Sequence, residues 1–103
     1  MIANNIHSKK KRSKEEIIAS ILDSARKGAS KTRIMYGSFL SFNQLQKYLD
    51  YTLQARLVDL SYSGKYVTTS KGLEYLKRFE EVQDIESDVT EKRRLLWDIL
   101  RED

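Results

Sequence analysis

The sequence predicts a mainly helical domain with one small β-hairpin, extended by a long C-terminal helix. Between residues 13 and 53, apolar residues recur at helical spacing in three segments that each begin at a serine. Aromatic and β-branched residues then flank a turn that contains glycine, which is typical of a hairpin. From residue 70 to residue 100 a last helical pattern continues without proline. At 103 residues the chain is expected to form one domain with a modest core.

The first helix is predicted to begin at Ser13, which has capping-box spacing to Glu16. Its apolar face follows at helical spacing and consists of Ile17, Ile18, Ile21, Leu22 and Ala25. Arg26 and Lys27 suit the negative C-terminal end of the helix dipole. Gly28 stands where a left-handed residue is expected to end the helix.

A second, shorter helix is expected over about residues 31–36, capped by Ser30 and ended by Gly37. Ile34 and Met35 are its candidates for the core. The connection to the next helix is short, which is typical of two helices joined by a tight turn.

The third helix is predicted to begin at Ser41, again with capping-box spacing to Gln44. Its buried stripe follows the i, i+3, i+4 pattern through Leu45, Tyr48, Leu49, Thr52 and Leu53. The opposite side is polar and carries Asn43, Gln46, Lys47 and Asp50.

A change in apolar period at Leu57 predicts a small hairpin. One strand segment leads to Tyr62, Ser63-Gly64 gives a two-residue turn signal, and a second segment covers residues 65–68. Tyr62 and Tyr66 are expected to pack the hairpin onto the first helix. The order helix, helix, helix, hairpin is that of a winged helix-turn-helix domain.

The last helix is expected to begin at Thr69 or Ser70 and to reach Leu100, a length of about 45 Å. One side of it repeats in alternate steps of four and three residues, the heptad pattern of a coiled coil, at Tyr75, Phe79, Val82, Glu86, Val89, Arg93, Leu96 and Leu100. This heptad stripe predicts a continuous helix that dimerises. The alternative is a break near Ser87-Asp88, with the tail as a separate short helix.

The two charged members of the heptad stripe favour an antiparallel dimer. In a parallel, in-register pair, Glu86 and Arg93 would each face their own copy. In an antiparallel pair that crosses near Val89, each moves toward the opposite charge on the other chain. The chain is therefore expected to have three parts, namely a flexible basic arm (1–12), the winged helix-turn-helix domain (13–69) and a dimerisation helix (70–103).

The net charge of +4 hides a strong asymmetry along the chain. Residues 1–14 carry five cations and no acid, residues 15–69 have a balance of +2, and residues 70–103 have a balance of −3. A polyanion would therefore be drawn to the first two-thirds of the molecule. The basic tail is either an arm that follows a groove of DNA or an ordinary solvated tail.

Little in the composition suits catalysis or a metal centre. The chain has no cysteine, which excludes disulfides and thiolate ligands. The one histidine, His7, lies in a lead-in without periodicity, and no glycine-rich phosphate motif occurs. We expect no enzyme activity, no cofactor and no metal. No apolar run approaches the roughly 18 residues of a membrane span and no signal-peptide pattern appears, so a cytoplasmic, nucleoid-associated protein is expected.

The third helix is the candidate for reading DNA. In a helix-turn-helix the second helix of the pair lies in the major groove, and its N-terminal residues meet base edges. Asn43 and Gln46 suit adenine, and Lys47 suits guanine or a phosphate. These three residues also form an acceptable solvated face in a protein that does not bind DNA. Phe42 contacts either the core or a thymine methyl group.

Cations recur on the other elements that this motif would bring to the same side. Lys31 and Arg33 lie at the start of the preceding helix, where the dipole favours a phosphate, and Lys65 lies at the hairpin tip. Arg33 has the alternative of a surface pair with Asp50 or Asp59, which would contribute little. The candidate DNA-binding residues are Lys9, Lys10, Lys11, Arg12, Lys31, Arg33, Ser41, Asn43, Gln46, Lys47 and Lys65.

Three stretches of the sequence, KKKRSKEEII, KTRIMYGSFLSF and GKYVTTSKGLEYL, resemble the small winged-helix DNA-binding proteins of Sulfolobus and related archaea, the Sso-ten-a family. The similarity extends from about Lys9 to Leu100, and KTRIMYG is its strongest part. The resemblance implies an antiparallel coiled-coil dimer with a winged helix at each end, associated with chromatin and largely tolerant of DNA sequence. Thr68 departs from the pattern, because winged helices often place a leucine there.

These observations favour a homodimeric protein that binds double-stranded DNA and organises archaeal chromatin by bridging or coating duplexes. Two alternatives stay open, a site-specific transcriptional repressor of the same fold and a protein-interaction module that dimerises through the last helix. RNA also stays open as a partner, because a basic surface does not discriminate between polyanions.

Overall fold

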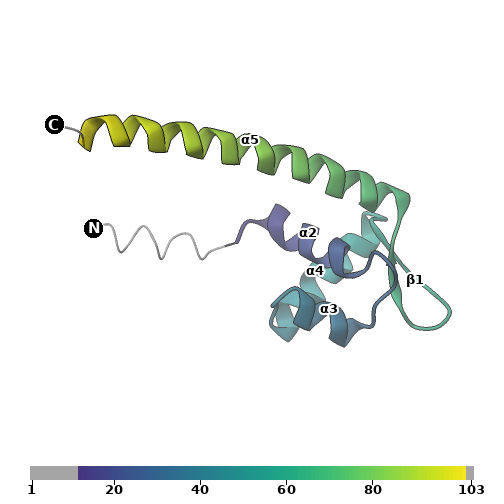
Figure 1. Ribbon diagram of the computed structural model, residues 1–103. Coiled ribbons are helices and arrows are strands. Elements are labelled where there is room, and N and C mark those ends of the chain that lie inside the picture. Colours follow the sequence, from purple (N-terminus) through teal and green to yellow (C-terminus); the bar gives the residue numbers. More distant parts are fainter. Residues whose placement is uncertain (1–11, 102–103) are drawn as a thin grey trace.

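The computed structural model describes residues 12–101 and confirms the mainly helical class with a small hairpin and a long C-terminal helix (Figure 1). The elements are α2 (Lys14–Ser24), α3 (Lys31–Gly37), α4 (Phe42–Gln54), β1 (Val58–Leu60), β2 (Tyr66–Thr68) and α5 (Ser70–Arg101). In space, α2 lies between α5 on one side and the α3–α4 pair on the other. The hairpin of β1 and β2 extends from the end where α5 begins (Figure 1).

The predicted serine caps begin the first three helices. The Ser13 hydroxyl accepts a hydrogen bond from the Glu16 amide at 3.1 Å, and the Glu16 carboxylate accepts one from the Ser13 amide at 2.9 Å. Ser41 and Gln44 repeat this capping box at the start of α4. The end of α2 differs from the prediction, because the helix stops at Ser24 and Gly28, at φ +94°, lies in the turn that follows.

The core is organised around the two apolar faces of α2. Ile21 on one face packs in a cluster formed with Ile17, Ala25, Ala29, Ile34, Leu40, Leu45 and Leu49. Leu22 on the next face packs with Ile18, Ala19, Leu57, Val58 and Leu76. Both Ile21 and Leu22 are fully buried. The predicted stripe of α4 is confirmed, with Leu45, Leu49 and Thr52 buried and Tyr48 and Leu53 half-buried.

The hairpin turn is longer than the predicted two residues. The strands pair in antiparallel register with Leu60 opposite Tyr66, and the Ser61 amide still bonds the Lys65 carbonyl at 2.8 Å. Three residues therefore close the turn, and the last of them, Gly64, has φ +84°. A left-handed residue at this position is the usual way to close a three-residue hairpin loop, so glycine marks its end rather than its centre.

A backbone bridge fixes the hairpin to the connection between α2 and α3. Ala29 and Tyr66 exchange two backbone hydrogen bonds of 2.9 and 2.8 Å. The buried Thr68 hydroxyl donates to the Leu22 carbonyl at 2.6 Å, which explains why a threonine is accepted where a leucine is common. Tyr66 packs against both core clusters, as predicted.

The last helix is continuous through Ser87-Asp88, and the alternative of a break there is not found. Its 32 residues correspond to about 48 Å. The Thr69 hydroxyl accepts a hydrogen bond from the Gly72 amide at 3.0 Å and so caps the helix. No helix in the described part of the chain is long and apolar enough to cross a membrane.

The junction between α5 and the domain predicts a large effect of a small substitution. A Cβ on Gly72 would lie 2.3 Å from the Leu57 carbonyl oxygen and 2.6 Å from a Thr68 methyl group. Gly72→Ala should therefore lower the free energy of unfolding by about 1–3 kcal/mol, as in other overpacked sites. Urea denaturation measures this loss. The exposed Ser87→Ala, in the middle of the same helix, should be neutral or slightly stabilising, and equal effects of the two changes would contradict the close packing.

Candidate nucleic-acid interface

The helices α3 and α4 contact each other on the side of the domain that faces away from α5 (Figure 1). The Ser30 hydroxyl accepts a hydrogen bond from the Arg33 amide at 3.1 Å, which leaves the Arg33 side chain exposed on the first turn. The Lys31 ammonium lies 5.8 Å from the centre of the Phe42 ring, within cation–π range. Positive charge from α3 is thus held beside the first residue of α4.

The exposed side of α4 carries the side chains that were predicted to meet DNA. Asn43 and Lys47 are both exposed and lie one helical turn apart. Gln46 is half-buried, and its amide nitrogen lies 3.4 Å from an Asp50 carboxylate oxygen. The Ser41 hydroxyl already serves as the helix cap. The structure therefore brings Asn43, Gln46 and Lys47 onto one surface, with Gln46 weakly held by a neighbour.

The distribution of ion pairs separates this surface from α5. On α5, carboxylates lie within 4.0 Å of four cations, Arg78, Lys92, Arg94 and Arg101. The hydrogen bond and charge of Arg94 lower the pKa of Glu91. Within residues 12–101, no such pair involves Lys31, Arg33, Lys47 or Lys65. The surface pair of Arg33 with Asp50 or Asp59 is not found there.

The sequence placed Arg12 in the flexible basic arm, but in the structure its side chain is hydrogen-bonded to the domain. Its guanidinium donates two hydrogen bonds of 2.6 Å, one to the Ser38 carbonyl after α3 and one to the Ser20 hydroxyl of α2. It thus ties the entry to α2 to the end of α3. The other cations of the predicted arm, Lys9, Lys10 and Lys11, lie outside the described residues, as does His7. The point where the arm joins the domain is therefore fixed close to the helix-turn-helix.

The wing places Lys65 and Tyr62 at its exposed tip. Tyr62 is fully exposed, so the expectation that it packs on the first helix is wrong. The reason is that β1 ends at Leu60, and the Ser61 side chain bonds the Lys65 backbone and closes the loop beyond the core. The length of that loop depends on the register of the strands, which the sequence pattern did not determine.

Two further aromatic side chains on this side were not singled out from the sequence. Tyr36 and Phe39 are exposed to 70% and 87%. Phe42 is also exposed, so the alternative that it belongs to the core is wrong. Phe39 has φ +55°, a left-handed conformation that bulky residues avoid. Its neighbours Ser38 and Leu40 are buried and hold it outward, so the aromatic ring projects from the turn between α3 and α4.

The predicted heptad stripe divides into two parts. Tyr75 and Phe79 are half-buried because they pack against the α2 cluster, and burial, with the nearby charge of Glu15 and Tyr51, raises the pKa of Tyr75. The members beyond them are exposed, namely Val82, Glu86, Val89, Arg93, Leu96 and Leu100. The outer part of the stripe is thus exposed, whereas Tyr75 and Phe79 keep only part of their surface exposed.

The comparison with known proteins agrees with this geometry. A family model described as winged helix-turn-helix matches residues 11–87, and the chain belongs to that family. The structure is also similar to the crystal structure of Sso10a-2, a DNA-binding protein from Sulfolobus solfataricus. The TM-score is 0.77 at 26% sequence identity, over 89% of this chain and 100% of that chain. The resemblance to the archaeal Sso-ten-a proteins is thereby confirmed. No curated protein matches the sequence significantly.

The conformation of Phe39 gives a test of whether this turn is shaped for binding. Phe39→Asn should raise the free energy of unfolding by about 1 kcal/mol, because asparagine tolerates the left-handed region and the exposed ring has little packing to lose. Thermal unfolding measures this gain. If the ring contacts DNA, the same variant will bind DNA more weakly although it is more stable. A loss of stability would show that the ring supports the fold.

Proposed function

We propose that this protein binds double-stranded DNA through the outer surface of α3, α4 and the wing, mainly by contacts to phosphates. The observation that carries this proposal is the set of cations on these three elements that form no ion pair within residues 12–101, namely Lys31, Arg33, Lys47 and Lys65. Two of them stand at the start of α3, where free backbone N–H groups add positive potential. The similarity to Sso10a-2, which is a DNA-binding protein, supports the same assignment.

In the proposed complex, the N-terminal half of α4 enters the major groove. Asn43 and Gln46 face base edges, and Lys47 reaches a guanine or a phosphate. Lys65 at the wing tip contacts the backbone or the minor groove beside it. The basic arm, residues 9–11, leaves the domain near Arg12 and follows the neighbouring groove. Most of these contacts are electrostatic, so binding is expected to tolerate many sequences.

We further propose that two copies pair antiparallel through α5 and organise archaeal chromatin. The exposed apolar members of the heptad stripe need a partner, and Glu86 and Arg93 favour the antiparallel arrangement. Such a dimer carries a winged helix at each end of a rod about 48 Å long. The two heads bridge two duplexes or coat one, with an effective affinity above that of a single head.

A site-specific transcriptional regulator with the same fold is the second candidate function. The exposed amide of Asn43, at the start of a helix that enters the major groove, favours this candidate. It would show a gap of about a thousandfold or more between one operator and random DNA. Neither candidate is an enzyme, and within residues 12–101 no group of three metal-ligating side chains occurs.

Removing the unpaired cations tests the proposed DNA surface. The variant Lys31→Ala, Arg33→Ala, Lys47→Ala should bind a random-sequence duplex roughly a hundredfold more weakly near 0.1 M salt. The slope of log affinity against log salt should become shallower by about 2.7, because each phosphate contact contributes about 0.9. Fluorescence anisotropy across a salt series measures both quantities.

A variant with the same loss of charge on α5 is the control. Lys77→Ala, Arg78→Ala, Lys92→Ala also removes three cations, but none of them lies on α3, α4 or the wing. Its affinity for the duplex should remain within a few-fold of the unchanged protein. Equal losses in the two variants would show that only net charge matters, and no loss in the first would overturn the proposed surface.

A further inference from the structure

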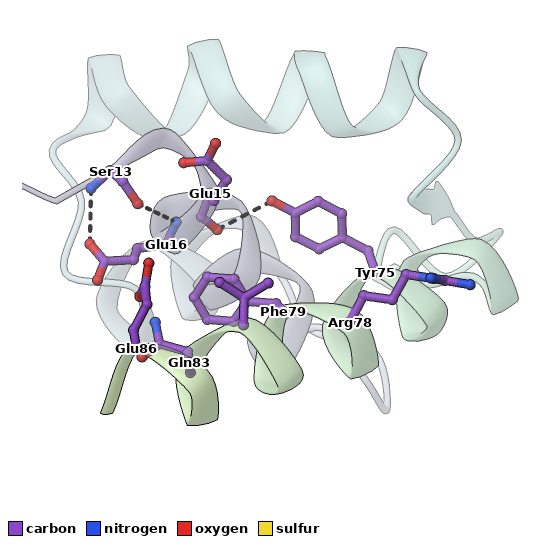
Figure 2. A pocket seen from close by; sticks show the side chains of 9 residues that line it. Ser13, Glu15, Glu16, Tyr75, Arg78, Phe79, Gln83 and Glu86 are labelled. Carbon is purple, nitrogen blue, oxygen red and sulfur yellow. Dashed lines mark hydrogen bonds between the residues drawn. The ribbon is translucent and has the colours of Figure 1, made fainter. Parts of the chain in front are cut away.

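A groove lies where α5 leaves the winged helix-turn-helix domain and passes the first turn of α2 (Figure 2). Its volume is about 570 Å³. Phe79 and Tyr75 on α5 form an apolar wall, and the Tyr75 hydroxyl reaches the Glu15 carbonyl at 3.4 Å (Figure 2). Carboxylates of Glu15, Glu16 and Glu86 stand around it. We call this the α2–α5 groove.

Trp97 is an apolar side chain that the heptad stripe does not explain. It is the only tryptophan of the chain, and 65% of it is exposed near the far end of α5. It lies one residue after the stripe residue Leu96, and so beside the stripe rather than in it. Leu76 has the same position relative to the stripe, one residue after the stripe residue Tyr75, and it is buried against the α2 cluster. Trp97 and the α2 side of the groove are therefore on the same flank of the helix.

An antiparallel pair brings this flank of one helix against the same flank of the other. The two-fold axis that relates the two copies is perpendicular to both helices. It reverses the direction of the second helix, so the flank that carries Trp97 on one helix lies beside the flank that carries Trp97 on the other. Trp97 lies eight residues after Val89. A crossing near Val89 therefore places Trp97 of the second copy level with Glu81, between Phe79 and Gln83, which both line the groove.

We propose that Trp97 of a second copy of this chain fills the α2–α5 groove. This inference rests on the proposed antiparallel dimer and adds the residue that joins each head to the other chain. Burial of an indole against Phe79 and Tyr75 removes a large apolar area from water. The end of one helix then contacts α5 and also the first turn of α2 of its partner.

The charges around the groove fit this occupant. The crossing near Val89 places Arg93 of the second copy level with Ile85, next to Glu86 at the groove. Within residues 12–101, Arg93 and Glu86 have no ion-pair partner of their own chain. An arginine beside the acidic side chains of the groove is electrostatically favourable, whereas a further acidic segment there would be repelled.

The single tryptophan makes the test direct. In the dimer, Trp97 emission should be shifted to shorter wavelength and its quenching by acrylamide reduced several-fold compared with a monomeric variant such as Val89→Asp. Size-exclusion chromatography with light scattering gives the oligomeric state of the same samples. A dimer with water-exposed emission overturns the inference and leaves the proposed dimer intact. A monomeric protein overturns both, and the salt series with duplex DNA still tests the DNA surface separately.

Cysteine pairs provide a second measurement that keeps Trp97 in place. The variant Glu15→Cys, Arg101→Cys puts one thiol at the groove and the other one helical turn beyond Trp97. A short bifunctional thiol reagent should link it into covalent dimers. Asp23→Cys, Arg101→Cys is the matched control, because Asp23 is exposed near the other end of α2. Equal cross-linking of both variants would overturn the inference.

Discussion

Burial of α2 on both of its faces is the constraint on which the rest of the structure depends. Ile21 packs toward α3 and α4, and Leu22 packs toward β1 and α5. Each fully buried side chain of this kind contributes about 1.5–3 kcal/mol. Because one short helix serves both layers, the α3–α4 pair and the long helix are forced onto opposite sides (Figure 1). The wing follows from the same helix, since Thr68 is hydrogen-bonded to the Leu22 carbonyl.

In this arrangement, the cations of α5 have different surroundings from the cations of α3, α4 and the wing. Four cations of α5 lie within 4.0 Å of carboxylates three or four residues away, namely Arg78, Lys92, Arg94 and Arg101, which suits an exposed rod. In the described part of the chain, the cations of α3, α4 and the wing form no such ion pairs, and this favours a polyanion on that side. Arg12 links α2 to the end of α3, because its hydrogen bonds to Ser38 and Ser20 fix the root of the basic arm beside the helix-turn-helix.

Features set by local interactions were predictable from the sequence, and features set by distant contacts were not. The capping boxes of Ser13 and Ser41 and the buried stripe of α4 follow from spacing alone, and all are confirmed. The contacts and exposure of the candidate site residues were harder to predict from the sequence. The engagement of Arg12 depends on Ser38, which is 26 residues away, and the exposure of Tyr62 depends on strand register. Phe39 occupies a left-handed position that glycine or asparagine would mark, so no residue type signalled it.

The outer half of α5 has a physical consequence for any assembly. Leu96, Trp97 and Leu100 are each more than 60% exposed on the part of α5 that extends beyond the winged helix-turn-helix domain. Exposed apolar clusters of this kind are sites of association. If only the stripe paired, the heads would be free to pivot where α5 leaves the domain. A tryptophan seated against α2 would instead fix the angle between head and rod, because α2 also carries α3 and α4. The direction in which the two DNA surfaces point, and hence the choice between bridging and coating, would then be determined by the dimer itself.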